Sequence, residues 1–258
     1  RFSLPKRHIV YNYPSIKTTW FIRIDSQIET VYGSGDHFVN IHKDAIQELQ
    51  RNGHEIGWHH HSYTMDDGKW IQDTNEEIIC ADLKKYGLLA MKHGIKICRM
   101  GWGYHTNETM KAISGMGFVL DSSAIPRPQY KWELSKKDWS MTGQDPYNPS
   151  LQNYQIQGET NLKTLQVPMN TMQLSLPTDT EKGVIRYINP AYRHEIFVNI
   201  VNEFFKTRKN MVLVCHPYEI LKTHDVKHPL LSFSMDDFKK NLEFLKESSI
   251  LSEIIKNS

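Results

Sequence analysis

Short apolar segments alternate with segments of helical periodicity along most of this chain, and this alternation limits the folds that it can adopt. Helical segments carry apolar residues at spacings of three and four, which is the pattern of a buried helix face. Glycines at 53, 87 and 117 favour helix ends, and Thr106 favours a helix start. The predicted helices are 41–52, 76–86, 106–116, 193–206 and a terminal helix over 235–256 that is capped by Ser234.

The apolar segments between these helices read as short strands, so the chain predicts βα units around a parallel sheet. We expect a distorted (β/α) barrel with seven or eight strands. A stretch at about 126–164 lacks steady periodicity and is rich in Pro, Gln, Asn, Tyr and Trp, which predicts a long loop excursion over the barrel mouth. The predicted strands are 20–24, 55–58, 97–100, 119–121, 165–168 and 212–215.

Three consecutive histidines, His59, His60 and His61, follow the run Gly53-His54-Glu55-Ile56-Gly57-Trp58. Neutral imidazole is the commonest protein ligand of zinc-class metals, and a histidine cluster at the end of an apolar strand would place several ring nitrogens around one point. The cluster therefore predicts a metal site. The alternative is that these histidines are ordinary surface or hydrogen-bonded residues.

Another metal motif can be set aside by its spacing. A zincin needs His-Glu-x-x-His on a helix, but His54 and Glu55 are followed by three residues before His59. Gly57 also weakens a helix interior, which favours a strand that delivers His59 at its end.

Cysteines, charge and apolar content limit the compartment and the partners. Cys80, Cys98 and Cys215 are an odd number at wide spacings, which favours free thiols and a reducing, cytoplasmic location. A formal net charge of +2 without a long basic block gives no reason to expect nucleic acid as a partner. No stretch approaches the ~20 apolar residues of a membrane span, although a chain that begins at Arg1 leaves room for a removed leader.

Five segments of the chain carry motifs in a recognisable order: 18–22, 53–59 (Gly-His-Glu-Ile-Gly-x-His), 99–103, 117–123 and 213–217. This ordered set resembles the NodB-homology polysaccharide deacetylases, carbohydrate esterases that remove N- or O-acetyl groups from sugars and that have Arg-x-Pro-Tyr-Gly at the third motif. The resemblance extends over nearly the whole chain, and it implies one polysaccharide-deacetylase-like domain over 1–258. Three further segments, 121–124, 138–139 and 146–150, are similar to members from capsule and O-antigen assembly.

The resemblance implies a divalent metal ion, which we expect to be zinc, and it departs from the family at two ligand positions. The family's second histidine falls four places after the first, where this chain has Tyr63, so His61 is the expected substitute for it beside His59. The family's Thr-Phe-Asp-Asp motif, which supplies a base and a metal carboxylate, is missing before Thr18. Either that segment lies outside this sequence, or Asp25 at the end of a strand serves instead; the alternative for Asp25 is a turn or cap residue.

Catalytic and substrate-binding roles also follow from the resemblance. His216 would protonate the leaving amine or alkoxide, and Arg99 would orient the catalytic carboxylate. The backbone N–H of Trp102 would contribute to an oxyanion hole, in a loop that Gly101 loosens by replacing the family's proline. Tyr104 and Trp139 are aromatics suited to stacking on sugar rings, with core packing as the alternative.

The expected activity is metal-dependent removal of an acetyl group from an acetylated sugar or polysaccharide precursor during O-antigen or capsule biosynthesis. Two alternatives remain open: a catalytically weakened relative that binds a glycan, and a metal-independent amidohydrolase on the same barrel. Nothing in the sequence indicates an oligomeric state.

Overall fold

The structure is a computed structural model of the chain, and it describes residues 12–126, 138–174, 184–207, 210–220 and 229–247. The chain divides into two compact units. We call Lys17–Pro168 the His59 unit, and Arg1–Ile16 with Met169–Ser258 the His216 unit. The single domain expected over 1–258 stays a prediction, and each unit is described by itself.

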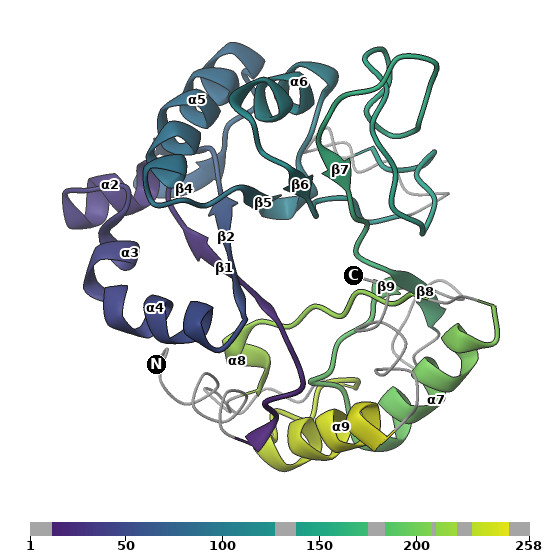
Figure 1. Ribbon diagram of the computed structural model, residues 1–258. Helices are drawn as coiled ribbons and strands as arrows, with labels where there is room; N and C mark the ends of the chain where they lie inside the picture. The colour runs from purple at the N-terminus through teal and green to yellow at the C-terminus, as the bar shows by residue number, and fades with distance from the viewer. Residues whose placement is uncertain (1–11, 127–137, 175–183, 208–209, 221–228, 248–258) are drawn as a thin grey trace. The chain divides into compact units, whose positions relative to one another are not determined.

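A five-stranded, fully parallel sheet forms the centre of the His59 unit (Figure 1). Its strand order is β1-β2-β5-β6-β7, so each strand pairs with the next one of the sheet along the chain. Five of the six predicted strand segments therefore lie together in one sheet, as expected for βα units. The strands are β1 (Thr19–Arg23), β2 (Glu55–His60), β5 (Ile97–Met100), β6 (Leu120–Asp121) and β7 (Leu165–Gln166).

Helices begin and end in the His59 unit largely where the capping residues of the sequence predict. The Thr106 side chain accepts a hydrogen bond from the backbone N–H of Thr109, and Gly117 closes the same helix in the left-handed conformation, with φ of 93°. Gly53, with φ of 76°, follows the helix predicted over 41–52. The helices are α2 (Ser26–Tyr32), α3 (His37–Ile41), α4 (Lys43–Arg51), α5 (Glu76–Lys92) and α6 (Asn107–Met116).

Gly87 does not end a helix, so the end predicted there is wrong. Helix α5 continues to Lys92, and it packs side by side with α6 (Figure 1). A β-carbon on Gly87 would lie 2.9 Å from the Met116 side chain and 3.2 Å from the ring of Trp58. Glycine thus lets α5 approach α6 and the sheet closely, and Trp58 is fully buried in this packing.

Two smaller features complete the His59 unit. A hairpin of β3 (Tyr63–Asp66) and β4 (Lys69–Gln72) follows the histidine cluster directly. The described part of the excursion, 138–164, packs against α6: its Trp139 and Tyr154 form a buried cluster with Met110. The remainder of the excursion, 127–137, lies outside the described residues.

Where the structure describes it, the His216 unit combines an antiparallel hairpin with three helices. The hairpin pairs β8 (Thr171–Leu174) with β9 (Val184–Tyr187), and α7 packs against α9 (Figure 1). Helix α7 confirms the helix predicted over 193–206, and α9 confirms the start after Ser234; residues 248–256 of that prediction lie outside the described residues. The helices are α7 (His194–Phe205), α8 (Pro217–Ile220) and α9 (Met235–Glu247).

The strand predicted over 212–215 is wrong. The segment is apolar and lies beside other backbone, because the Val214 N–H donates to the Ile188 carbonyl over 3.1 Å. However, the Val212 N–H donates to the side chain of Asn170 at 2.5 Å, so the regular ladder of a strand does not form.

The fold is thus α/β, built in the His59 unit on a parallel sheet. No closed sheet is found among the described residues, so the barrel stays a prediction. No helix in the described ranges has both the length and the apolar character needed to cross a bilayer.

Candidate functional site

The histidine cluster lies at the carboxyl edge of the parallel sheet. Arg23, His59 and Arg99 stand side by side in the register of β1, β2 and β5. Because side chains alternate along a strand, His59 and His61 project to one side and His60 to the other. His60 is buried against the Tyr86 ring and bonds Ser62 Oγ at 2.9 Å. Burial lowers the pKa of His60 to about 3, so this histidine is a neutral core residue.

His59 is held in the tautomer that a metal ligand needs. Its Nδ1 lies 2.8 Å from the Arg99 carbonyl oxygen, which can only accept, so Nδ1 carries the proton. In the neutral ring Nε2 therefore presents a lone pair. A backbone carbonyl on the second ring nitrogen is the usual arrangement around metal-ligating histidines.

The Nε2 atoms of His59 and His61 face one another at 3.1 Å. Two nitrogens bound to one tetrahedral zinc ion, with bonds of about 2.0–2.1 Å, would lie about 3.3 Å apart. This donor pair fits a zinc-class ion. Within the described residues, no group of three or more His, Cys, Asp or Glu side chains is arranged to hold an ion.

Asp25 is near the pair, but its carboxylate is fully engaged. Oδ1 accepts from the Ile28 N–H at 3.0 Å as the N-cap of α2, and Oδ2 accepts from Arg23 Nε at 2.8 Å and forms an ion pair with Arg23 Nη2, 2.7 Å away. The backbone N–H of His61 also donates to it. Burial raises the Asp25 pKa, although these donors and the Arg23 charge oppose the rise. The structure thus gives Asp25 the cap role weighed above and makes it an anchor for His61; its roles as ligand and base stay predictions.

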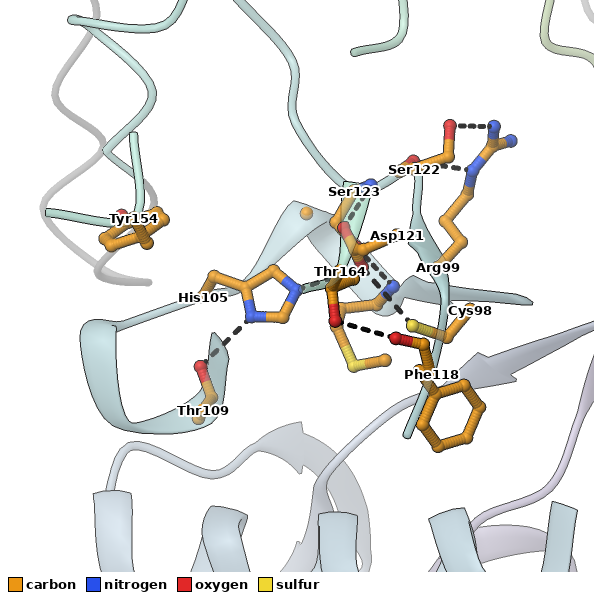
Figure 2. Close-up of polar contacts among 12 residues, drawn as sticks. Cys98, Arg99, His105, Thr109, Phe118, Asp121, Ser122, Ser123, Tyr154 and Thr164 are labelled. Carbon is orange, nitrogen blue, oxygen red and sulfur yellow. Dashed lines mark hydrogen bonds and ion pairs between the residues drawn. The ribbon is translucent and has the colours of Figure 1, made fainter. Parts of the chain in front are cut away.

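Arg99 joins β5 to the segment after β6. Its Nε donates to the Ser122 carbonyl at 2.8 Å and its Nη2 to Ser122 Oγ at 2.9 Å, as Figure 2 shows. The guanidinium also lies over the Phe21 ring, 4.3 Å from its centroid. Arg99 therefore lies beside His59 on the neighbouring strand. Asp25, the carboxylate that we expected Arg99 to orient, pairs with Arg23 instead.

The three aromatics predicted to contact substrate differ in exposure. Trp102 is 51% exposed, whereas Tyr104 is 5% and Trp139 is 3% exposed. Trp139 donates from Nε1 to the Gly103 carbonyl at 2.7 Å, and Tyr104 lines a small internal cavity with His60. The buried pair, Tyr104 and Trp139, thus takes the core-packing role that was the alternative, and the oxyanion role of the Trp102 backbone stays a prediction.

A buried polar network lies behind this edge, centred on Asp121 (Figure 2). Its Oδ2 accepts from Ser123 Oγ at 2.6 Å, His105 Nε2 at 3.2 Å and Cys98 Sγ at 3.5 Å. Burial opposes ionisation, but His105 and Ser123 outweigh it and lower the Asp121 pKa. Burial and the adjacent Asp121 raise the Cys98 pKa well above the ordinary range, so this thiol is a core residue.

His216 is clamped within its own unit by Glu219. The chain starts α8 with Pro217, and the Glu219 carboxylate accepts from the His216 backbone N–H at 2.6 Å and lies 3.1 Å from ring Nδ1. Asn189 and Tyr187 donate to the same carboxylate, each at 2.9 Å. Burial raises the Glu219 pKa, but the bonds from His216 and Asn189 outweigh it and the net shift is downward.

This clamp fixes the orientation of the His216 ring. A carboxylate only accepts hydrogen bonds, so Nδ1 donates to Glu219 and Nε2 takes no part in this bond. The His216 side chain is 46% exposed while that of Glu219 is 5% exposed. The His-Pro-x-Glu spacing of a capping box could have revealed Glu219 in the sequence.

Neither a protein-family model nor a curated protein sequence matches the chain. A solved structure similar to it is the crystal structure of a "putative polysaccharide deacetylase" from Mycobacterium smegmatis, with a TM-score of 0.42 and 14% sequence identity. The match covers 78% of this chain and 57% of that chain, so this chain spans little more than half of its neighbour. A likeness this distant leaves the activity to be argued from the side chains.

Proposed function

We propose that this chain is a metal-dependent hydrolase that removes an acetyl group from an acetylated sugar in the assembly of a surface polysaccharide such as capsule or O-antigen. The ordered motifs that resemble the NodB-homology deacetylases support this proposal. The proposal includes the (β/α) barrel fold of that family. The observation that carries it is the pair of imidazole Nε2 atoms of His59 and His61, 3.1 Å apart at the carboxyl edge of a parallel sheet.

His59 and His61 would hold the ion, which we propose to be zinc. Bound there, a divalent ion would polarise the acetyl carbonyl and lower the pKa of water toward neutrality. Arg99 would contribute through its carbonyl, which fixes the His59 tautomer. Trp102, exposed beside His61 at a ring-centroid distance of 6.1 Å, would present an apolar face to the sugar.

His216 would act as the general acid that donates a proton to the leaving group. Hydrolysis breaks the bond from the carbonyl carbon to the sugar nitrogen or oxygen, and water supplies the new oxygen of acetate. A proton on His216 Nε2 would pass to the departing atom, with Nδ1 held by Glu219.

The test compares metal content and turnover in protein purified without a histidine tag. Elemental analysis should find a divalent ion in the wild type and not in His59→Ala/His61→Ala, while acetate release from acetylated sugars is lost with it. His37→Ala is the control, because His37 is half-buried like the proposed ligands but stacks on Tyr32 elsewhere. Equal metal content in all three proteins would overturn the metal site, and turnover that survives a chelator would favour the metal-independent amidohydrolase.

A second candidate function is a glycan-binding relative that does not turn over its ligand. The observation that favours it is Asp25, whose two oxygens are both committed to Arg23 and to the cap of α2. Calorimetric binding of an acetylated oligosaccharide without release of acetate would support this alternative. Release of acetate would exclude it.

A further inference from the structure

The ring of His61 lies directly on the backbone of Gly101. A β-carbon built on Gly101 would overlap Nδ1 and Cε1 of this ring. Gly101 is not among the glycines with positive φ, so its backbone conformation would suit other residues. Glycine is therefore required at this position because the imidazole occupies the space of a side chain.

Tyr63 supplies a second contact to the same ring. The His61 and Tyr63 rings stack with centroids 4.7 Å apart and planes 6° apart. Tyr63 Oη accepts a hydrogen bond of 3.1 Å from Nε1 of Trp102, the residue that follows Gly101. The turn after β5 thus contacts the imidazole through Gly101 and is tied to its stacking partner through Trp102.

The backbone of this turn is itself constrained. Trp102 has φ of 58°, a left-handed conformation that is unfavourable for a residue with a β-carbon. A β-carbon on the next residue, Gly103, would lie 2.8 Å from the Ser123 carbonyl oxygen, so the turn is packed tightly on its far side too. Strained residues of this kind persist where the surrounding structure determines them, and they concentrate at functional sites.

We infer that Gly101, Tyr63 and Trp102 form a clasp that orients His61, directing its Nε2 toward Nε2 of His59. The three are positioning residues, and their assignment rests on the proposed metal site. The clasp also gives Tyr63 a defined role, because its ring stacks on the imidazole of His61.

The experiment measures cobalt(II) affinity and, separately, the His61 ring in metal-free protein. Gly101→Ala should weaken cobalt binding about 10- to 100-fold, the usual effect of losing an outer-shell contact of a metal ligand. Gly115→Ala is the matched control, because a β-carbon there meets nothing within 4 Å, and it should bind as the wild type does. Tyr63→Phe keeps the stacked ring and should retain most of the affinity that Tyr63→Ala loses.

Proton NMR of the metal-free protein reports the clasp without relying on the ion. Ring-current shifts of the His61 carbon-bound protons should be present in the wild type and reduced in Gly101→Ala and Tyr63→Ala. Wild-type affinity and shifts in Gly101→Ala would overturn the clasp. A wild type that binds no cobalt but keeps the shifts would overturn the metal site while supporting the clasp, and Tyr63→Ala provides the test if Gly101→Ala does not fold.

Discussion

Replacing Asp121 by alanine should destabilise the His59 unit by about 1.5–3 kcal/mol, the typical contribution of a hydrogen bond to a charged group. The carboxylate is fully buried and accepts from Ser123 N at 2.8 Å, Ser123 Oγ at 2.6 Å and His105 Nε2 at 3.2 Å. The bonds share this one carboxylate and do not add, so the value for a single bond to a charged group sets the scale of the expected loss.

The assay is urea unfolding followed by tryptophan fluorescence at neutral pH. Asp66→Ala is the control, since Asp66 is exposed at the end of β3 and should change stability by less than about 0.5 kcal/mol. His105→Ala should also destabilise, and the double variant should lose about 1–3 kcal/mol less than the sum of the single variants because each leaves the other group buried without its partner. A loss below about 1 kcal/mol for Asp121→Ala, or strict additivity, would refute the argument.

The pH dependence of the Asp121 contribution to stability has a defined sign. Folding lowers the Asp121 pKa below its ordinary 3.8, so its stabilising contribution is complete above that value and is lost as the pH falls through the folded pKa. The difference in stability between the wild type and Asp121→Asn should therefore shrink in acid and be constant between about pH 5 and 7. A difference that grows on acidification would contradict this assignment.

The remaining predictions concern His216. His216→Ala should lower kcat by about two to four powers of ten without changing metal content, as measured by acetate release and elemental analysis; lost metal or a near-normal rate would remove its role as the acid. Glu219→Gln should lower kcat about 10-fold or more and alter the His216 tautomer in nitrogen NMR, because Nδ1 loses its carboxylate; an unchanged tautomer would contradict the clamp. Since folding lowers the Glu219 pKa below its ordinary 4.5, the wild type should lose this contribution to stability only in acid, whereas the glutamine variant lacks it at every pH.

Local signals made much of the fold predictable. Helix α6 begins after Thr106 and ends at Gly117 as predicted, because capping depends on a few neighbouring backbone groups. The apolar run before His59 forms β2, also as predicted. The helix end predicted at Gly87 was wrong because the sequence does not distinguish a glycine in a closely packed helix interior from a glycine that ends a helix. The run at 212–215 misled it because a side chain, Asn170, takes a backbone donor that a ladder would have used.

The candidate site was predictable only in part, for a similar reason. The high local density of histidines in the sequence was the signal that marked this cluster. Once β2 is known, the alternation of side chains along a strand places His60 on the opposite side from His59 and His61. Burial of Tyr104 depends on contacts with α5 and the sheet, which no local pattern encodes. Gly101 was expected to loosen its loop by replacing a proline, but the structure gives this glycine a steric reason instead: the His61 ring lies against it.

The tyrosine at 63 and the glycine at 101, two positions where this chain differs from the deacetylase motifs that it resembles, have one physical explanation. A residue two places after His59 stays on the same side of the strand, whereas the residue four places after it already belongs to β3. An imidazole on His61 then passes over the turn after β5, where a β-carbon at 101 would collide with it. The position at 63 is left to a ring that stacks on the imidazole. The imidazole of His61 therefore requires the glycine at 101 and gives the tyrosine at 63 its place, so these three residues should be exchanged together or not at all.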